Sequence, residues 1–212
     1  APGRPDLTYE ALGGVVDTAG RVLASRGIAP GVPVAIVLPN GPEMGAVFLA
    51  VASHAVAAPL NPAYTADEFA FYMEDLGAKL LVTLEGNDTP ARAAAERLGI
   101  PIADVVPGEA AGSFGFAGDT SESEATLNGA DDVALVLHTS GTTSRPKIVP
   151  LTAENITTSA RNIAATLDLT PEDRCLNIMP LFHIHGLIAA VLSSVSAGAS
   201  ISCAPGFDAL KF

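Results

Sequence analysis

Apolar residues recur at two alternating spacings along the chain, and this alternation predicts an α/β fold. Residues 12–23 place apolar side chains three or four positions apart, as in an amphipathic helix. The next run, "VPVAIVLPN" from Val32 to Asn40, is continuously apolar and has the length of a buried strand. The same alternation continues along most of the chain. Short apolar strands separated by helices predict largely parallel sheets that are covered by helices on both faces.

Short capping motifs mark where several of these helices begin. Thr65 and Glu68 form a Thr-x-x-Glu capping box, in which each side chain bonds the other residue's backbone N–H. Thr89 followed by Pro90 supplies an N-cap and a first-turn proline to a later, alanine-rich helix. Thr152 takes the N-cap position before a further helix. These positions predict helix starts independently of the apolar spacing.

Composition divides the chain at residues 107–132, which are rich in Gly, Ser, Ala and acidic residues and show little periodicity. We interpret this stretch as a loop or linker. It separates a first α/β half of the domain, residues 1–106, from a second α/β segment, residues 133–212. Apolar Leu210 and Phe212 at the end of the chain indicate missing partners. We therefore expect an N-terminal piece whose partner is the downstream part of the same protein.

Charge and cysteine content indicate which binding partners and which cellular compartment the sequence favours. The 212 residues carry a net charge of −12 and no cluster of Lys and Arg, which argues against a nucleic-acid surface. Cys175 and Cys203 match no metal-binding spacing, which favours a reducing cytoplasm. Residues 175–207 lack charged side chains apart from two histidines, but Pro, Gly and Ser interrupt them. We expect no membrane span, because a span needs about 20 mostly apolar residues in one helix.

The stretch from Thr139 to Lys147, "TSGTTSRPK", is the strongest candidate for chemistry. Six small residues, five of them hydroxylated, follow an apolar strand, and they cannot build a core. Turn N–H groups, hydroxyl donors and one ammonium can together hold a polyphosphate. The spacing Gly141-x5-Lys147 is not a Walker A motif, because Pro146 precedes the lysine and a strand is expected after it. The alternative interpretation is a polar surface hairpin.

The same residues carry a resemblance to a known family. "TSGTTSRPK" resembles the phosphate-loop signature of the adenylate-forming (AMP-binding) enzymes, which include acyl-CoA synthetases, luciferases and peptide-synthetase adenylation domains. "MPLFHIHGL" stands where this family has its next motif, and "AAPLNPAYTADEFAFYMEDLGAKLLV" is similar to its N-terminal region. The chain is therefore identified as part of the large N-terminal domain of an acyl-CoA synthetase. Within the family it most resembles the oxalate–CoA ligases.

This resemblance implies a two-step reaction and a set of ligands. A carboxylate attacks the α-phosphate of ATP to give an acyl-adenylate and pyrophosphate, and the thiol of coenzyme A then displaces AMP. Mg²⁺ is implied as the metal, with Thr139 among its contacts. His183 and His185 are implied to line the acid pocket, although for His185 a satisfied local role is an equal alternative. The residues implied to bind the β- and γ-phosphates are Thr139, Ser140, Gly141, Thr142, Thr143, Ser144 and Lys147.

Two departures from the family pattern raise a question about the backbone. Ser144 and Ile148 stand where the family usually has glycine. If the backbone at Ile148 needed a positive φ, a β-branched residue would be strained by about 1–3 kcal/mol. If this position lies in a strand, isoleucine suits it well. His54 and His138 are expected to be structural.

Other functions remain open at this stage. A ligase for a medium- or long-chain or aromatic acid is the nearest alternative, because neighbouring subfamilies share these motifs. From another class, a non-catalytic nucleotide- or phosphate-binding module also fits the hydroxylated loop, and a partner-binding scaffold fits the apolar end of the chain. The family's later motifs, including its C-terminal catalytic lysine, are not found in these residues. We therefore expect the 212-residue chain to be inactive on its own.

Overall fold

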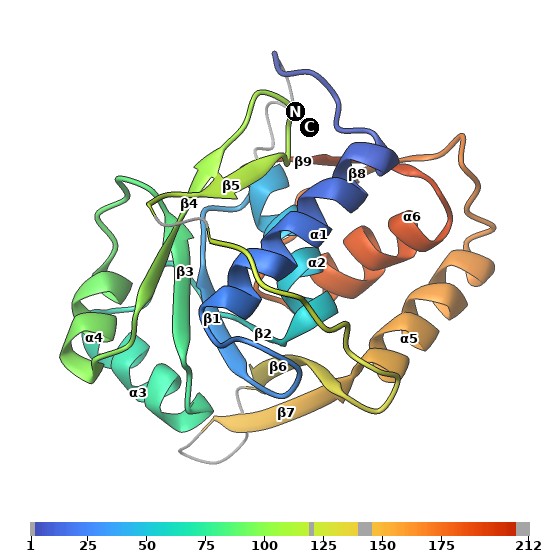
Figure 1. The fold of residues 1–212 in the computed structure, drawn as a ribbon. Helices are drawn as coiled ribbons and strands as arrows, with labels where there is room; N and C mark the ends of the chain where they lie inside the picture. The colour runs from blue at the N-terminus through green and yellow to red at the C-terminus, as the bar shows by residue number, and fades with distance from the viewer. Residues whose placement is uncertain (1–2, 119–120, 140–145, 207–212) are drawn as a thin grey trace.

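A seven-stranded sheet forms the centre of the protein in the computed structural model, which describes residues 3–118, 121–139 and 146–206. The strand order is β5-β4-β3-β1-β2-β6-β7 (Figure 1). The strands from β4 to β6 in this order are parallel, and the outer strands β5 and β7 are antiparallel to their neighbours. The predicted α/β class with a largely parallel sheet is confirmed. The strands are β1 (Pro33–Val37), β2 (Val56–Pro59), β3 (Leu80–Leu84), β4 (Ile102–Pro107), β5 (Phe114–Phe116), β6 (Val133–Thr139) and β7 (Lys147–Thr152).

Helices cover both faces of this sheet, and the side-chain alternation of β1 shows why. Val34 and Ile36 point into the core shared with α1 (Tyr9–Ser25) and α2 (Pro42–His54). Ala35 and Val37 point to the opposite face, into the core shared with α3 (Ala66–Leu76) and α4 (Pro90–Leu98). Figure 1 shows the two helix pairs on opposite sides of the sheet. A strand that is buried on both faces must be apolar throughout, as β1 is.

The helix α2 lies at the centre of the larger core. Eight of its 13 residues are buried, including Phe48 and Val51. It contacts α1, the sheet strands β2 and β6, and a second layer made of η1 and β9. Gly45 faces this second layer, since a Cβ there would lie 3.9 Å from Cys203 Sγ and from Val191. A helix whose middle turns are apolar on every side is typical of extensive burial. The second layer consists of β8 (Arg174–Asn177), η1 (His185–Leu192), α6 (Ser193–Ser196) and β9 (Ser200–Cys203), with α5 (Ala153–Thr166) beside it.

The predicted helix caps are confirmed. Thr65 and Glu68 make both bonds of the capping box at the start of α3. The Thr89 side chain accepts from Ala91 N at the start of α4, where Pro90 is the first residue. Thr152 caps α5 and forms a second capping box with Asn155. These local bonds satisfy N–H groups that the first turn of a helix leaves without partners.

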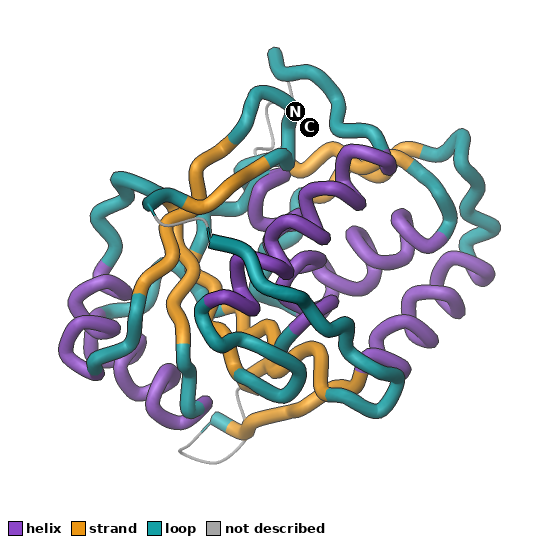
Figure 2. The backbone as a smooth tube through the Cα atoms, in the orientation of Figure 1, coloured by secondary structure: helices purple, strands orange, loops and turns teal. Residues whose placement is uncertain are grey.

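Residues 107–132 differ from the loop that composition predicts, because they contain the strand β5. This strand pairs with β4 at the edge of the sheet, with Phe116 opposite Val105. A strand of three residues is too short to show the alternation of apolar and polar positions that predicts a strand. Farther along, residues 121–132 run across α1 and α2 (Figure 2). Asn128 holds them there by donating from Nδ2 to the carbonyls of Ala52 and Ala55 at 2.9 and 2.8 Å.

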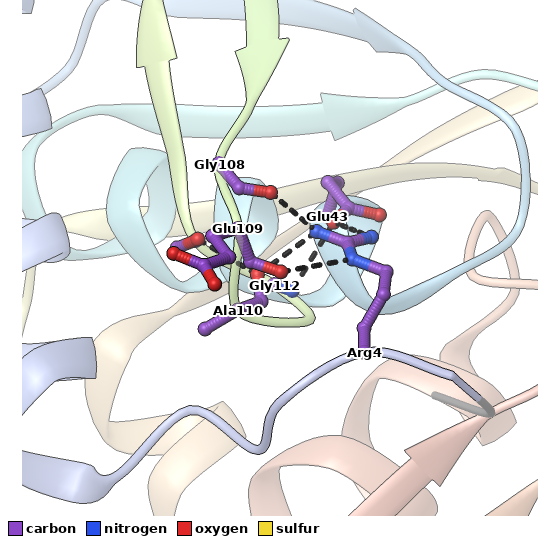
Figure 3. A network of polar contacts seen from close by, with 7 residues as sticks. Arg4, Glu43, Gly108, Glu109, Ala110 and Gly112 are labelled. Carbon is purple, nitrogen blue, oxygen red and sulfur yellow. Dashed lines mark hydrogen bonds and ion pairs between the residues drawn. The ribbon is translucent and has the colours of Figure 1, made fainter.

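A polar network fastens the N-terminal segment to the β4–β5 connection (Figure 3). Arg4 pairs with Glu43 at 2.6 Å and donates to the carbonyls of Gly108 and Ala110, each at 2.9 Å. Glu43 also accepts from Gly112 N at 3.1 Å. Glu43 lies in the first turn of α2, where the helix dipole favours a negative charge. Segments far apart in sequence are thereby joined at the start of the central helix.

The apolar stretch after residue 184 has an unusual winding. Its sequence, "IHGLIAAVLSSVSAG", is typical of a single α-helix, whereas the structure has the π-helix η1 followed by one turn of α6. Apolar spacing cannot distinguish these windings when nearly every position is apolar. Among the described residues, no helix is both long enough and apolar enough to cross a membrane.

Gly20 of α1 offers a test of the packing between α1 and α2. A Cβ at Gly20 would lie 2.3 Å from Nε2 of His54, a side chain that is 5% exposed. We expect Gly20→Ala to lower the free energy of unfolding by about 1–3 kcal/mol, because the buried ring has little room to move. The measurement is urea unfolding followed by circular dichroism.

Gly14→Ala in the same helix is the matched control, because a Cβ there meets nothing within 4 Å. It should raise the free energy of unfolding by about 0.5–1 kcal/mol through helix propensity alone. Equal stability of the two variants would contradict the described contact between Gly20 and His54.

Candidate functional site

The two ends of the candidate phosphate loop are cross-strand neighbours. In the β6–β7 pair, Thr139 lies opposite Lys147, and His138 lies opposite Ile148. Opposed residues of an antiparallel pair share one face of the sheet, with Cβ atoms about 4.5–5.5 Å apart. Thr139 and Lys147 are both exposed, so a hydroxyl and an ammonium stand side by side at the carboxyl end of β6. Ser140, Gly141, Thr142, Thr143 and Ser144, which the sequence also assigns to phosphate binding, lie outside the described residues.

The backbone question at Ile148 is answered by β7. Ile148 is a strand residue that pairs with His138. Among the described residues other than glycine, positive φ occurs at Asp168 and not at Ile148. Isoleucine therefore sits in ordinary extended backbone, which β-branched residues favour. The strand that begins at Lys147 also confirms that no helix N-terminus follows the loop.

His138 anchors the end of β6 to α3. Its Nε2 lies 3.2 Å from Oδ2 of Asp75, and its ring meets the Tyr72 ring edge-on at 4.6 Å between centroids. Tyr72 in turn stacks on Tyr64 at 4.8 Å. Burial lowers the pKa of His138, and the bond to Asp75 offsets part of that effect. These contacts face α3 and support the structural role expected for His138.

The second part of the candidate site is the histidine turn, residues 179–186, which follows β8 and includes the first two residues of η1. His183 and His185 are both exposed in it. The turn is closed by a bond from His183 N to the Pro180 carbonyl at 3.2 Å. Gly186 packs so closely on Pro180 that a Cβ would lie 2.6 Å from the Pro180 oxygen. Glycine is therefore required at this position, and both imidazoles are accessible to a ligand.

Two asparagine side chains hold the histidine turn by hydrogen bonds to its backbone. Asn177, which is 1% exposed, accepts from Met179 N at 3.0 Å through Oδ1. Asn40 accepts from Leu181 N at 2.8 Å through Oδ1 and donates from Nδ2 to the Ala204 carbonyl at 2.8 Å. The sequence indicates Asn40 only as the end of a strand. Its position between an apolar strand and the Gly-Pro start of a helix is the single signal that marks it.

The described residues suit an anionic ligand rather than a metal held by protein groups alone. No hydrogen bond or ion pair within residues 3–118, 121–139 and 146–206 joins the histidine turn to Thr139 or Lys147. Lys147 has no carboxylate partner within those ranges, so its charge is available to a phosphate. The same ranges contain no group of three or more His, Cys, Asp or Glu side chains able to hold a metal ion. The Thr139 hydroxyl is a hard oxygen ligand that suits Mg²⁺ alongside phosphate oxygens.

Comparison with known proteins identifies the family. The profile described as AMP-binding enzyme matches residues 3–212. The chain belongs to this AMP-binding enzyme family. A similar protein is the oxalate–CoA ligase of Arabidopsis thaliana, which is 43% identical over 99% of this chain and 43% of its own length. Another is the long-chain-fatty-acid–CoA ligase FadD13 of Mycobacterium tuberculosis, 31% identical over 97% of this chain and 41% of its own length.

Solved structures of the family have the same fold. ATP-bound MatB from Rhodopseudomonas palustris superposes with a TM-score of 0.79 at 30% identity, covering 100% of this chain and 44% of that one. The chain thus spans less than half the length of these AMP-binding relatives. The adenylate-forming family that the loop signature indicates is confirmed.

The two cysteines of this AMP-binding chain differ in their surroundings. Cys203 is 7% exposed at the end of β9, and burial raises the pKa of its thiol to about 11. Cys175 is half-buried on the neighbouring strand β8. The thiolate is the reactive form, so a raised pKa together with burial makes a thiol inert.

We expect iodoacetamide at pH 8 to alkylate Cys175 well before Cys203 in the folded protein. Cys203 should react appreciably only as the pH approaches its pKa of about 11. Tandem mass spectrometry can assign the modification to each cysteine, and a urea-unfolded sample provides the control in which both react. Equal rates in the folded protein at pH 8 would contradict the described burial of Cys203.

Proposed function

We propose that the complete protein is an ATP-dependent carboxylate–CoA ligase and that its acid is oxalate. The pairing of Thr139 with Lys147 at the base of the hydroxylated loop carries this proposal. The 43% identity to an oxalate–CoA ligase over 99% of the chain supports it. In this proposal the chain supplies the phosphate-binding hairpin and part of the acid pocket, while downstream residues complete the active site. The cytoplasmic location expected from the sequence stays a prediction.

In the first step of the proposed reaction, a carboxylate oxygen of the acid attacks the α-phosphorus of ATP. The bond between that phosphorus and the bridging oxygen breaks, and pyrophosphate leaves with the electron pair. Lys147 would hold a positive charge against the oxygens on which negative charge develops, and the Thr139 hydroxyl would donate to them or ligate Mg²⁺. Fixed donors aimed at developing charge lower the barrier, because they need no reorganisation during the reaction. When bound, Mg²⁺ would neutralise further charge on the phosphate oxygens.

The second step transfers the acyl group to coenzyme A. The thiol sulfur attacks the acyl carbon of the adenylate, and AMP leaves with the oxygen that joined it to the acyl group. The thiol proton passes to solvent or to a group outside the described residues. We assign His183 and His185 to the acid pocket, since both are exposed on one short turn. A protonated imidazole there would pair with the second carboxylate of a diacid.

Lys147→Ala in the complete protein tests the phosphate role. We expect the rate of carboxylate-dependent pyrophosphate release to fall on the order of 100-fold, as when one preorganised charge-stabilising donor is removed. Lys79→Ala is the matched control, because Lys79 is exposed just before β3, at the opposite edge of the parallel strands. Its effect should stay within about two-fold. An unchanged rate in Lys147→Ala would favour the polar surface hairpin instead.

A panel of acids tests the substrate. Pyrophosphate release by the complete protein is measured with ATP, Mg²⁺ and acids ranging from oxalate to aromatic and long-chain fatty acids. We expect release with oxalate and little with the long-chain acids. Release with long-chain acids and none with oxalate would keep the ligase and discard the diacid, an outcome that the 31% identity to FadD13 makes the main alternative. Nucleotide binding without release by any acid would indicate a non-catalytic module.

A further inference from the structure

Asn40 connects three segments near the amino end of α2: the β1–α2 loop, the histidine turn and the end of β9. It follows β1, and the next residues, Gly41 and Pro42, open α2. Its amide bridges Leu181 of the histidine turn and Ala204 at the end of β9, which lie 141 and 164 positions away in sequence. Because β1 and α2 are buried, the support on which this side chain stands is rigid. A rigid support is what a residue needs to hold another group in place.

The two contacts require a side chain that both accepts and donates. Leu181 N can only donate, and the Ala204 carbonyl can only accept, so one acceptor and one donor must project from a single short side chain. Only one of the two orientations of the Asn40 amide satisfies both partners. Aspartate would lose the donor, and leucine would leave both backbone groups without a partner. Backbone groups that lose their partners away from water are costly, which favours a side chain with both functions at this position.

The contact reaches the histidines through a short and tightly closed turn. Leu181 is 1% exposed, so its position is also fixed by its apolar side chain. Two residues later, His183 is bonded through its N–H to the Pro180 carbonyl, and its own carbonyl accepts from Leu187 N at 3.2 Å. Gly186 packs closely against Pro180, so the backbone of this turn has little room to move. A displacement at Leu181 must therefore move His183 and His185 as well.

We infer that Asn40 is a positioning residue for acid binding: its amide sets where His183 and His185 stand. This inference rests on the proposed function for its second half, the effect on the acid. Asn40 does not touch the substrate in this arrangement and acts only through the histidine turn. The effect should thus fall on the acid and spare ATP, whose proposed contacts lie at the Thr139–Lys147 pair.

The test compares Asn40→Leu with Asn87→Leu in the complete protein. Asn87 follows β3, the strand beside β1 in the sheet, and its side chain makes no hydrogen bond to any described residue. The first readout is hydrogen–deuterium exchange of peptides that cover residues 175–192, and it needs no enzyme activity. We expect faster exchange in this segment for Asn40→Leu and no change for Asn87→Leu, because Leu181 N–H loses its acceptor. Unchanged exchange in Asn40→Leu would overturn the anchoring role.

The second readout separates positioning from a merely structural role. We expect Asn40→Leu to raise the KM for oxalate on the order of 10-fold, the scale of one lost polar contact, with the KM for ATP nearly unchanged. Faster exchange with an unchanged KM for the acid, or with both KM values raised equally, would overturn the positioning role. If Asn40→Leu does not fold, Asn40→Asp keeps the acceptor for Leu181 and loses only the donor to Ala204. It should show the same selectivity with a smaller change.

Failure of the proposed function has a separate signature. The unsubstituted protein would then release no pyrophosphate with any acid, before any variant is compared. That result overturns the acid-binding half of the inference, while the exchange measurement still decides the anchoring half.

Discussion

The burial of α2 in the larger core is the constraint on which the rest of the structure depends. The helix lies between the seven-stranded sheet and the second layer of η1 and β9, with α1 along its flank. A charged side chain on the buried part of this helix would carry a large desolvation cost. Its acidic residue, Glu43, lies in the first turn and pairs with Arg4. Small residues such as Gly45 and Ala46 allow neighbouring elements to approach it closely. The site elements are thus built around one apolar core and not on independent supports.

Polar side chains fasten neighbouring connections to both ends of this helix. The last turn of a helix leaves carbonyl groups without partners inside the helix. Asn128 donates to the Ala52 and Ala55 carbonyls at the carboxyl end of α2. His54 is held there through Nδ1, which lies 3.0 Å from the Thr126 carbonyl. At the amino end the Glu43 side chain accepts from Gly112 N, which ties the β4–β5 connection to the helix. These bonds hold the two connections against α2, although the connections have little regular structure themselves.

Local features of the sequence predicted most of the elements, because they follow from neighbouring residues alone. The run that forms β1, the capping box at Thr65 and the strand after Lys147 are of this kind. The contacts of Asn40 and Asn128 are of another kind, since their partners lie far away in sequence. A single asparagine gives no signal of which distant carbonyl it will meet. The candidate site was accordingly predicted by residue type, whereas its supporting amides became visible only in the fold.

The order of the strands has a consequence for how the chain acquires its structure. Strands β1 and β2 pair within one βαβ unit, and β3 and β4 pair within another, so these partners find each other across short stretches of chain. Strand β6 instead docks on β2, with Ala57 beside Leu135, after the chain has passed through α3, β3, α4, β4 and β5. Closing so long a loop costs more entropy than closing a local one, and non-local pairings of this kind slow folding. The hairpin that presents Thr139 and Lys147 would therefore take its place late, on a half-sheet that has already formed.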